Sequence, residues 1–319
     1  MNAFFRNAMV YRLSADWTLT TDALDEQLAR MEFSPGTSVQ TQSIGWVPAL
    51  EHGSLAHVVG RQILLTLRAE KKLLPASVVN QVAKARAQEA EERQGYKPGR
   101  KQMKEIKEAV TDELIPKAFS IFRDTRVWID PVNGWLLIDT TSPAKAEEVV
   151  GVLSRSIDPF ALQPVQVPQS PAAAMTGWLA ADEAPAGFTI DQDTELRATG
   201  DSRAAIRYVR QSIEVADVRR HIEDGKQCTR LAMTWAGRIS FVLTETLALK
   251  RIAPLDVLKE GDGESGSDAA ERFDSDFTMM AGELSRLLAD LVGALGLDVE
   301  AKGALGVKAG AGAAQKLAA

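Results

Sequence analysis

The sequence holds little of what a secreted, membrane-spanning or disulfide-bonded protein would need. Its 319 residues include a single cysteine, Cys228, so no internal disulfide can form, which suits a reducing compartment. No run of about 18 or more apolar residues is present, and this argues against a membrane-spanning helix. The first residues, MNAFFRNAMVYRLS, have no basic lead before a long apolar segment, so we expect no signal peptide. These absences predict a cytoplasmic protein with no membrane partner.

Signals for enzyme chemistry, metals and cofactors are also missing. The three histidines form no HExxH pattern, and neither a GxGxxG nor a GxxxxGK[ST] phosphate loop is present. Cys228 has no histidine close by in sequence, so we interpret it as a small packing residue. Carboxylates between Glu260 and Glu271 are spaced faintly like those of a calcium loop, but Ser265 stands where such a loop requires glycine. We therefore expect no catalytic residues, no metal and no cofactor.

The remaining composition is that of an ordinary globular protein, and its charges are segregated. Hydrophobic residues make up 45% and charged residues 25%, and a chain of this length suggests two or three subdomains. The formal charge of −6 argues weakly against a nucleic-acid partner. However, Arg93–Lys107 holds six basic residues against one acidic, Arg203–Arg251 holds ten against five, and Asp256–Glu300 holds three against twelve. Because salt screens charges beyond about 10 Å, such blocks matter more to a polyanion than the total.

Local patterns in the first half predict strands around a helical hairpin. We expect a strand at residues 8–14, a helix at 21–31, a turn at 45–48 and a second strand at 62–70. A polar helix at 75–94 then stops at Gly95, and Pro98 suits the first turn of a second helix that runs to about 114. The clearest signal follows, with two apolar runs around Asn133–Gly134, a favoured hairpin turn, and a helix that begins at Ser142–Pro143.

The second half predicts an antiparallel pattern followed by a long helix. A proline-rich connection at 162–174 marks the expected boundary. Strands are expected at 203–213, 226–235 and 238–245, with a short helix that ends at Gly225. An acidic loop at 259–271 precedes a helix at 276–295, whose heptad-like apolar spacing would pack on a second subunit or on its own domain.

These elements predict an α+β fold of mixed antiparallel sheets with a helical-hairpin tip. The expected domains are a central α+β domain at 1–75 and 117–165, a helical tip region at 76–116, a sheet-plus-helix base domain at 166–300 and a flexible, Ala/Gly-rich tail at 301–319.

The first basic block places its cations on one face of the second hairpin helix. At about 100° per residue, Arg100, Lys101, Lys104 and Lys107 fall within an arc of about 120°, beside a narrower apolar arc. Such a face can line a phosphate backbone and gain affinity by counterion release, although Glu108 weakens it. The alternative is an ordinary solvated helix surface.

The second basic block predicts a positive sheet face. Strand alternation puts Leu231, Met233 and Trp235 on one side, and Lys226, Cys228 and Arg230 on the other. Cations from neighbouring strands would join the wet side: Arg207, Arg210 with Gln211, Lys250 and Arg251. Arginine there can bind phosphate oxygens with two N–H groups. The alternative is a surface neutralised by the acidic C-terminal third. No motif for reading bases is present.

Several segments together resemble one family, the bacterial recombination-associated proteins called RdgC. They occur in the family's order over nearly the whole chain: MVYRLS, GWVP, LIPKAFSIF, VWIDPVNGWLLID, HIEDGKQCTRLAMTW, RISFV, LKRI and ERFDSDFTMMAGELSRLLADLVGALG. The resemblance implies α+β subunits that close into a homodimeric ring around duplex DNA, without marked sequence preference, and that restrain the strand-exchange recombinase. It also implies association with the nucleoid. The tail beyond Gly296 departs from the family, because it is longer and rich in Ala and Gly.

The resemblance also implies roles for particular residues. Phe119, with Lys117, matches the phenylalanine that closes one of the family's two dimer contacts, and Arg210 with Gln211 matches a basic residue and a glutamine that face the hole. Together with the two basic blocks, the expected DNA-binding residues are Lys97, Arg100, Lys101, Lys104, Lys107, Arg207, Arg210, Gln211, Lys226 and Arg230. Single-stranded DNA and direct contact with the recombinase stay open as further partners. The alternatives in other classes are a scaffold that recruits the recombinase and an enzyme that acts on an anionic small molecule.

Overall fold

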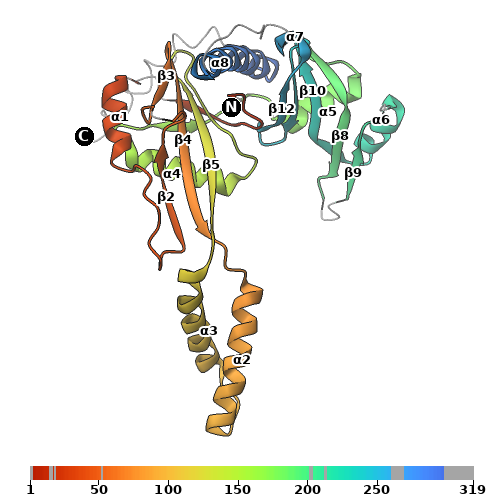
Figure 1. Cartoon of the computed structure of the whole chain (residues 1–319). Helices are drawn as coiled ribbons and strands as arrows, with labels where there is room; N and C mark the ends of the chain where they lie inside the picture. The colour runs from red at the N-terminus through yellow and green to blue at the C-terminus, as the bar shows by residue number, and fades with distance from the viewer. Residues whose placement is uncertain are drawn as a thin grey trace, which may run out of the picture. The chain divides into compact units, whose positions relative to one another are not determined.

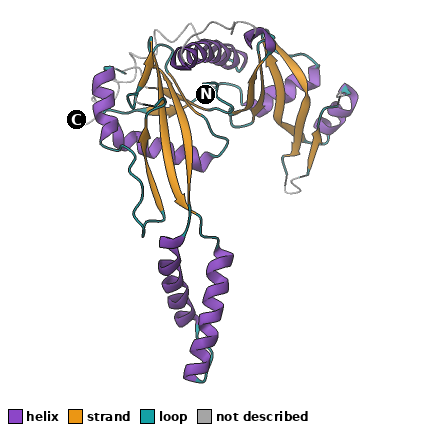
Figure 2. Ribbon diagram, viewed as in Figure 1, coloured by secondary structure: helices purple, strands orange, loops and turns teal. Residues whose placement is uncertain are grey.

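A computed structural model describes residues 3–13, 17, 19–51, 53–200, 204–211, 214–259 and 269–297. Figures 1 and 2 show the arrangement of its elements. The chain divides into two compact units, each with its own contacts. Unit 1 comprises Met1–Thr21, His57–Leu64 and Arg126–Ala319, and unit 2 comprises Asp22–Ala56 and Leu65–Thr125. The expected acidic loop and the C-terminal tail lie largely or wholly outside the described residues.

The fold is α+β with two antiparallel sheets, as the sequence predicts. The larger sheet has the order β2-β4-β5-β6-β1-β7, with β3 also paired to β4. Its strands are β1 (Met9–Leu13), β2 (Gln42–Val47), β3 (His57–Val59), β4 (Gln62–Lys72), β5 (Ser120–Asp130), β6 (Trp135–Ile138) and β7 (Leu162–Pro164). The smaller sheet lies within unit 1 and has the order β12-β11-β10-β8-β9. Its strands are β8 (Phe188–Ala198), β9 (Ala205–Tyr208), β10 (Lys226–Trp235), β11 (Ile239–Thr244) and β12 (Leu249–Pro254).

The helices begin and end at recognisable local signals. They are α1 (Thr21–Ala29), α2 (Ala76–Gln94), α3 (Arg100–Leu114), the short 3-10 helix η1 (Ile115–Lys117), α4 (Pro143–Ser156), α5 (Pro171–Ala181), α6 (Val215–Glu223), α7 (Asp256–Lys259) and α8 (Ala269–Ala294). Gly95 ends α2 with φ of 80°, and the Ser142 side chain accepts a hydrogen bond from the backbone N–H of Lys145 at the start of α4. Among the described residues, no helix is long and apolar enough to cross a membrane.

The predicted turn at residues 45–48 is wrong, because Gly45, Trp46 and Val47 belong to β2. The glycine is needed there for close approach and not for a turn. A Cβ atom on Gly45 would lie 2.5 Å from the Cα of Phe33, and the N–H of Phe33 donates to the carbonyl of Trp46 at 2.9 Å. The segment around Phe33 therefore runs directly against the strand.

The region around the proline-rich connection is also more structured than expected. Residues Leu162–Pro164 form β7, which pairs with β1, and α5 begins at Pro171 with Ser170 as its N-cap. The following strand β8 was not predicted. The last helix begins at Ala269 and not at 276, and its apolar residues Phe277, Met280, Leu284, Leu287 and Leu291 are completely buried. The helix thus packs on its own unit, which was one of the two alternatives.

A buried carboxylate organises the strand pair of the larger sheet in unit 1. Asp130, at the end of β5, is completely buried. One oxygen accepts from the backbone N–H groups of Val132 (3.0 Å) and Asn133 (3.1 Å), and from the side chain of Gln62 (3.1 Å). The other accepts from the side chains of Asn133 (2.8 Å) and Ser285 of α8 (3.1 Å). This single carboxylate shapes the turn and ties it to a strand and a helix distant in sequence.

We predict that Asp130→Ala lowers the free energy of unfolding by about 3 kcal/mol, because it leaves five partly buried donors without their acceptor. Urea denaturation followed by circular dichroism measures this loss. Glu223→Ala, at an exposed site on α6, is the matched control and should stay within about 0.5 kcal/mol of wild type. Equal stabilities for the two variants would contradict the role assigned to Asp130.

Candidate nucleic-acid interface

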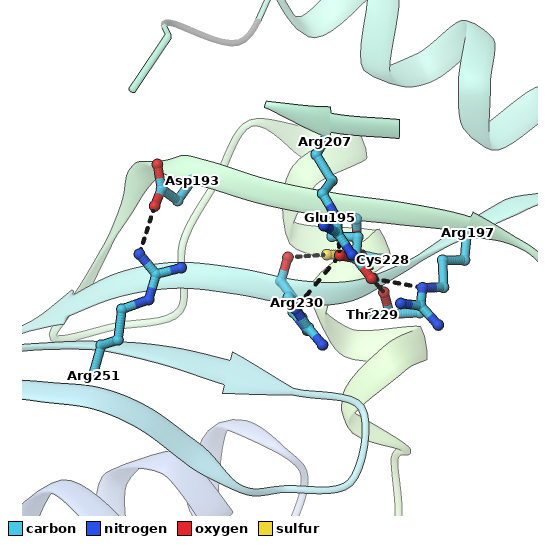
Figure 3. A network of polar contacts seen from close by, with 8 residues as sticks. All are labelled: Asp193, Glu195, Arg197, Arg207, Cys228, Thr229, Arg230 and Arg251. Atoms are coloured by element: carbon cyan, nitrogen blue, oxygen red, sulfur yellow. Dashed lines mark hydrogen bonds and ion pairs between the residues drawn. The ribbon is translucent and has the colours of Figure 1, made fainter. Parts of the chain in front are cut away.

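One face of the smaller sheet is covered by helices, and the other carries the arginines. Helix α5 packs on β10, where the backbone N–H of Cys228 donates to the hydroxyl of Thr176 at 2.9 Å. The Trp235 indole donates to Asp290 of α8 at 2.8 Å. The side chains of Arg197, Arg207, Arg230 and Arg251 gather around β8 with their carboxylate partners, as Figure 3 shows. We call this set of arginines, together with Arg210, the arginine face.

Glu195 of β8 is the centre of the arginine face. Its carboxylate accepts from Nε of Arg197 at 2.6 Å and from Nε of Arg207 at 2.5 Å, and lies 3.6 Å from Nη1 of Arg230. The Glu195 side chain is only 4% exposed, whereas those of the three arginines are between 42% and 59% exposed. Burial alone would raise the pKa of Glu195, but the hydrogen bonds and the field of Arg230 outweigh it and lower that pKa. The carboxylate therefore stays charged beneath three exposed guanidinium groups.

Asp193, two residues earlier on β8, holds the other two arginines. It accepts from the backbone N–H of Arg210 at 2.9 Å and from Nη1 of Arg251 at 3.0 Å. These contacts lower the pKa of Asp193, with the Arg210 N–H as the largest cause. Arg210 and Arg251 have φ values of 50° and 52°, in the left-handed region that non-glycine residues rarely adopt. Two carboxylates thus hold the guanidinium groups of four arginines and the backbone of a fifth, so the face keeps a positive excess.

The structure corrects the strand alternation predicted for β10. Opposite β8, Cys228 pairs with Leu196 and Arg230 pairs with Glu195, so Thr229 is an extra residue that forms a β-bulge. Cys228 consequently lies on the helix-covered side with Leu231 and not on the face that carries the Arg230 side chain, and its thiol donates to the backbone carbonyl of Arg230 at 3.2 Å. The thiol is buried, which raises its pKa to about 12 and fits a packing residue.

The structure places Lys226 apart from the arginine face. Its ammonium group pairs with Asp224 at 3.3 Å, and its side chain is only 14% exposed. By contrast, Gln211 is exposed directly after Arg210. Because β8 was not predicted from the sequence, Arg197 was missed. The signal that could have shown it is the alternation of charged residues along this segment, from Asp191 to Arg197, which is typical of a strand with one polar face.

The second expected basic surface is the α2–α3 hairpin of unit 2. Lys97, Arg100, Lys101, Lys104 and Lys107 are all exposed, as the helical periodicity predicts. The two helices are tied together by side-chain hydrogen bonds between Gln94 and Gln102, one of them 2.9 Å long, and by an ion pair between Arg86 and Glu113. Lys104 lies 3.6 Å from Glu108 in an exposed pair that offers little stability.

Unit 2 has both an exposed aromatic side chain and an apolar hollow. Phe119 is 83% exposed, and its carbonyl accepts from the backbone N–H of Leu73 at 2.7 Å. Lys117 pairs with Glu113 at 3.2 Å. A hollow of about 490 Å³ is lined on its apolar side by Leu74, Ala76, Val79 and Ile115, and elsewhere by Lys71, Lys72 and Lys107. The exposed phenylalanine and this hollow lie in the same unit.

Among the residues that the structure describes, no group of three His, Cys, Asp or Glu side chains could hold a metal ion. The described site is a charged surface built from arginine and lysine side chains, which can attract phosphate groups.

Comparisons with known proteins give a consistent result over nearly the whole chain. The family model described as "Putative exonuclease, RdgC" matches residues 3–298. A relative from Bordetella parapertussis, named "Recombination-associated protein RdgC", is 67% identical over 293 residues, which cover 92% of this chain and 98% of the relative. Proteins of the same name from Janthinobacterium sp. (strain Marseille) and Burkholderia ambifaria are 58% and 57% identical over 299 and 295 residues. These matches cover 94% and 92% of this chain and 100% and 96% of the relatives.

Proposed function

The chain belongs to the RdgC family, and from this premise we propose that it binds duplex DNA without reading its sequence, as a homodimeric ring that encloses the duplex. The arginine face carries the proposal. Its exposed guanidinium groups are held by buried or partly buried carboxylates and can contact phosphate oxygens. The exposed cations of the α2–α3 hairpin would add contacts to the same polyanion. Positive charge of this kind attracts any duplex alike, because every sequence presents the same backbone.

The exposed Phe119 and the apolar hollow support a contact between two copies of the chain. A two-fold contact uses the same surface on both subunits, so a projecting group and its receiving hollow must both be present on each chain. Unit 2 offers both, with Phe119 as the projecting group and Leu74, Val79 and Ile115 among the hollow's apolar residues. We propose that Phe119 enters the partner's hollow and closes the ring.

We further propose that the protein acts by occupying DNA and not by cutting it, in the cytoplasm and on the nucleoid. The relatives are named for recombination, and a protein that coats or encloses DNA would limit the strand-exchange recombinase by competition for the same substrate. The family description names an exonuclease, so DNA cleavage is the competing activity that an experiment must address.

A salt titration of duplex binding tests the electrostatic basis. Several phosphate contacts per dimer predict a slope of log affinity against log salt of about −4 or steeper. Arg207→Glu with Arg210→Glu should lower the affinity for unrelated sequences alike, by about tenfold or more, and flatten the slope. Arg219→Glu with Arg220→Glu makes the same charge change on helix α6 and is the control. A flat wild-type slope, or no binding at low salt, would remove the proposal.

Phe119→Ala tests the closing contact. Loss of a well-buried aromatic anchor costs about 2 kcal/mol, so the variant should release closed circular DNA faster than wild type in a high-salt wash. Because the family resemblance implies a second contact, sedimentation should still find a dimer. Val257→Ala removes an exposed apolar side chain from unit 1 and should behave as wild type. Unchanged retention of circles by Phe119→Ala would show that the ring closes elsewhere.

A strand-exchange reaction tests whether the protein acts by covering DNA. The yield of exchanged product and the length of the DNA are both measured. Added protein should lower the yield only at ratios that cover the DNA, and excess free duplex should restore it. The labelled DNA should keep its full length in the presence of Mg²⁺. Inhibition that survives excess duplex would instead indicate direct contact with the recombinase, and shortened DNA would establish the exonuclease.

A further inference from the structure

A small hollow on the arginine face is lined by arginines from three strands. It measures about 160 Å³, and Arg207 of β9, Arg230 of β10 and Arg251 of β12 all line it. Glu195 and Asp193 lie at the same hollow. Such convergence is unusual for a merely solvated surface, because like charges repel unless something holds them together. The size and the donor set suit one tetrahedral oxyanion.

Each of these arginines is bound at one side and leaves other donors available. A guanidinium carries five N–H groups, and Arg207 uses its Nε to bind Glu195. Arg251 uses Nη1 to bind Asp193, and Nη1 of Arg230 faces Glu195. No other side-chain bond of Arg207 or Arg251 occurs among the described residues. The carboxylates therefore orient the guanidinium groups while most N–H groups stay open to a ligand, which reduces the rotamer entropy lost on binding.

Two residues next to this hollow have a backbone conformation that is rare for any residue other than glycine. Arg251 holds a left-handed conformation where β12 has one extra residue opposite β11, and Arg210 does so after β9. Glycine would adopt this conformation at no steric cost. Strain of this kind tends to persist where a side chain serves a function. The Arg251 side chain pairs with Asp193 and lines the hollow. A glycine at this position would relieve the strain but would lack the guanidinium group.

We propose that this hollow is the seat for one phosphodiester group of the DNA backbone, and that Glu195 and Asp193 are positioning residues that hold its arginines. This inference rests on the proposed DNA binding and adds a specific claim to it. Affinity at this place depends on how the guanidinium groups are fixed, and not only on the number of positive charges. The two ideas make opposite predictions when a carboxylate is neutralised.

Glu195→Gln separates them by the sign of its effect. The change makes the face more positive, so charge alone predicts tighter duplex binding and a steeper salt slope. Loss of positioning predicts the reverse, and we expect affinity to fall by about threefold or more. Glu245→Gln makes the same charge change at an exposed residue after β11 and should bind as tightly as wild type or slightly tighter. Inorganic phosphate should compete with the duplex more strongly than chloride at equal ionic strength, and this difference should disappear in Glu195→Gln.

Arg251→Gly and Arg251→Ala keep the test decisive if Glu195→Gln does not fold. Both remove the guanidinium, but only glycine relieves the strained backbone. We expect the glycine variant to have the higher midpoint of thermal unfolding, and both variants to bind duplex about equally and more weakly than wild type. Wild-type affinity for duplex in both Arg251 variants, or tighter binding by a folded Glu195→Gln, would overturn the phosphate seat and leave the proposed DNA binding intact. Absence of wild-type binding at low salt would instead overturn the proposed function.

Discussion

The buried carboxylate of Glu195 is the interaction on which the arginine face depends. Three arginines that converge from three neighbouring strands would repel one another, and a lone carboxylate with 4% exposure would be costly to bury. Together the groups satisfy each other, because the hydrogen bonds keep the carboxylate ionised and the carboxylate offsets the repulsion. The remaining charge is positive and faces outward. A surface suited to phosphate can thus exist on a chain whose total charge is −6.

The same principle recurs at two other places in unit 1. Asp130 accepts five hydrogen bonds and joins the turn after β5 to Gln62 and to Ser285 of α8. Glu283 of α8, buried to a similar degree as Glu195, accepts two bonds from Arg238 at 2.7 and 2.8 Å and one from Arg286. These two networks connect α8 to both sheets. The buried Asp130 and its neighbours in the turn at residues 130–134 are therefore explained by folding, whereas the arginines around Glu195 point to binding.

The two basic surfaces use different physics. On the α2–α3 hairpin the cations are long, exposed side chains with few partners, such as Lys104 with its weak pair to Glu108. They can adapt to a backbone but lose rotamer entropy when they do. On the arginine face, Glu195 and Asp193 already orient the guanidinium groups to which they are bonded. These side chains therefore lose less rotamer entropy when they bind a ligand. The hairpin therefore offers mobile cations, and the arginine face offers cations in fixed positions. Both suit DNA, because its phosphates are regularly spaced whatever its base sequence.

The sequence by itself determined the features that depend on neighbours within a few residues. Helical spacing with Gly95 predicted the hairpin and its exposed cations, and Asn133–Gly134 predicted the strand pair. Only the tertiary structure decided which arginines share a carboxylate, because the bulge at Thr229 and the pairing of β8 with β9 and β10 depend on contacts far apart in the chain. Gly45 shows the same limit, since its neighbour Phe33 lies on another segment and a local pattern could only suggest a turn.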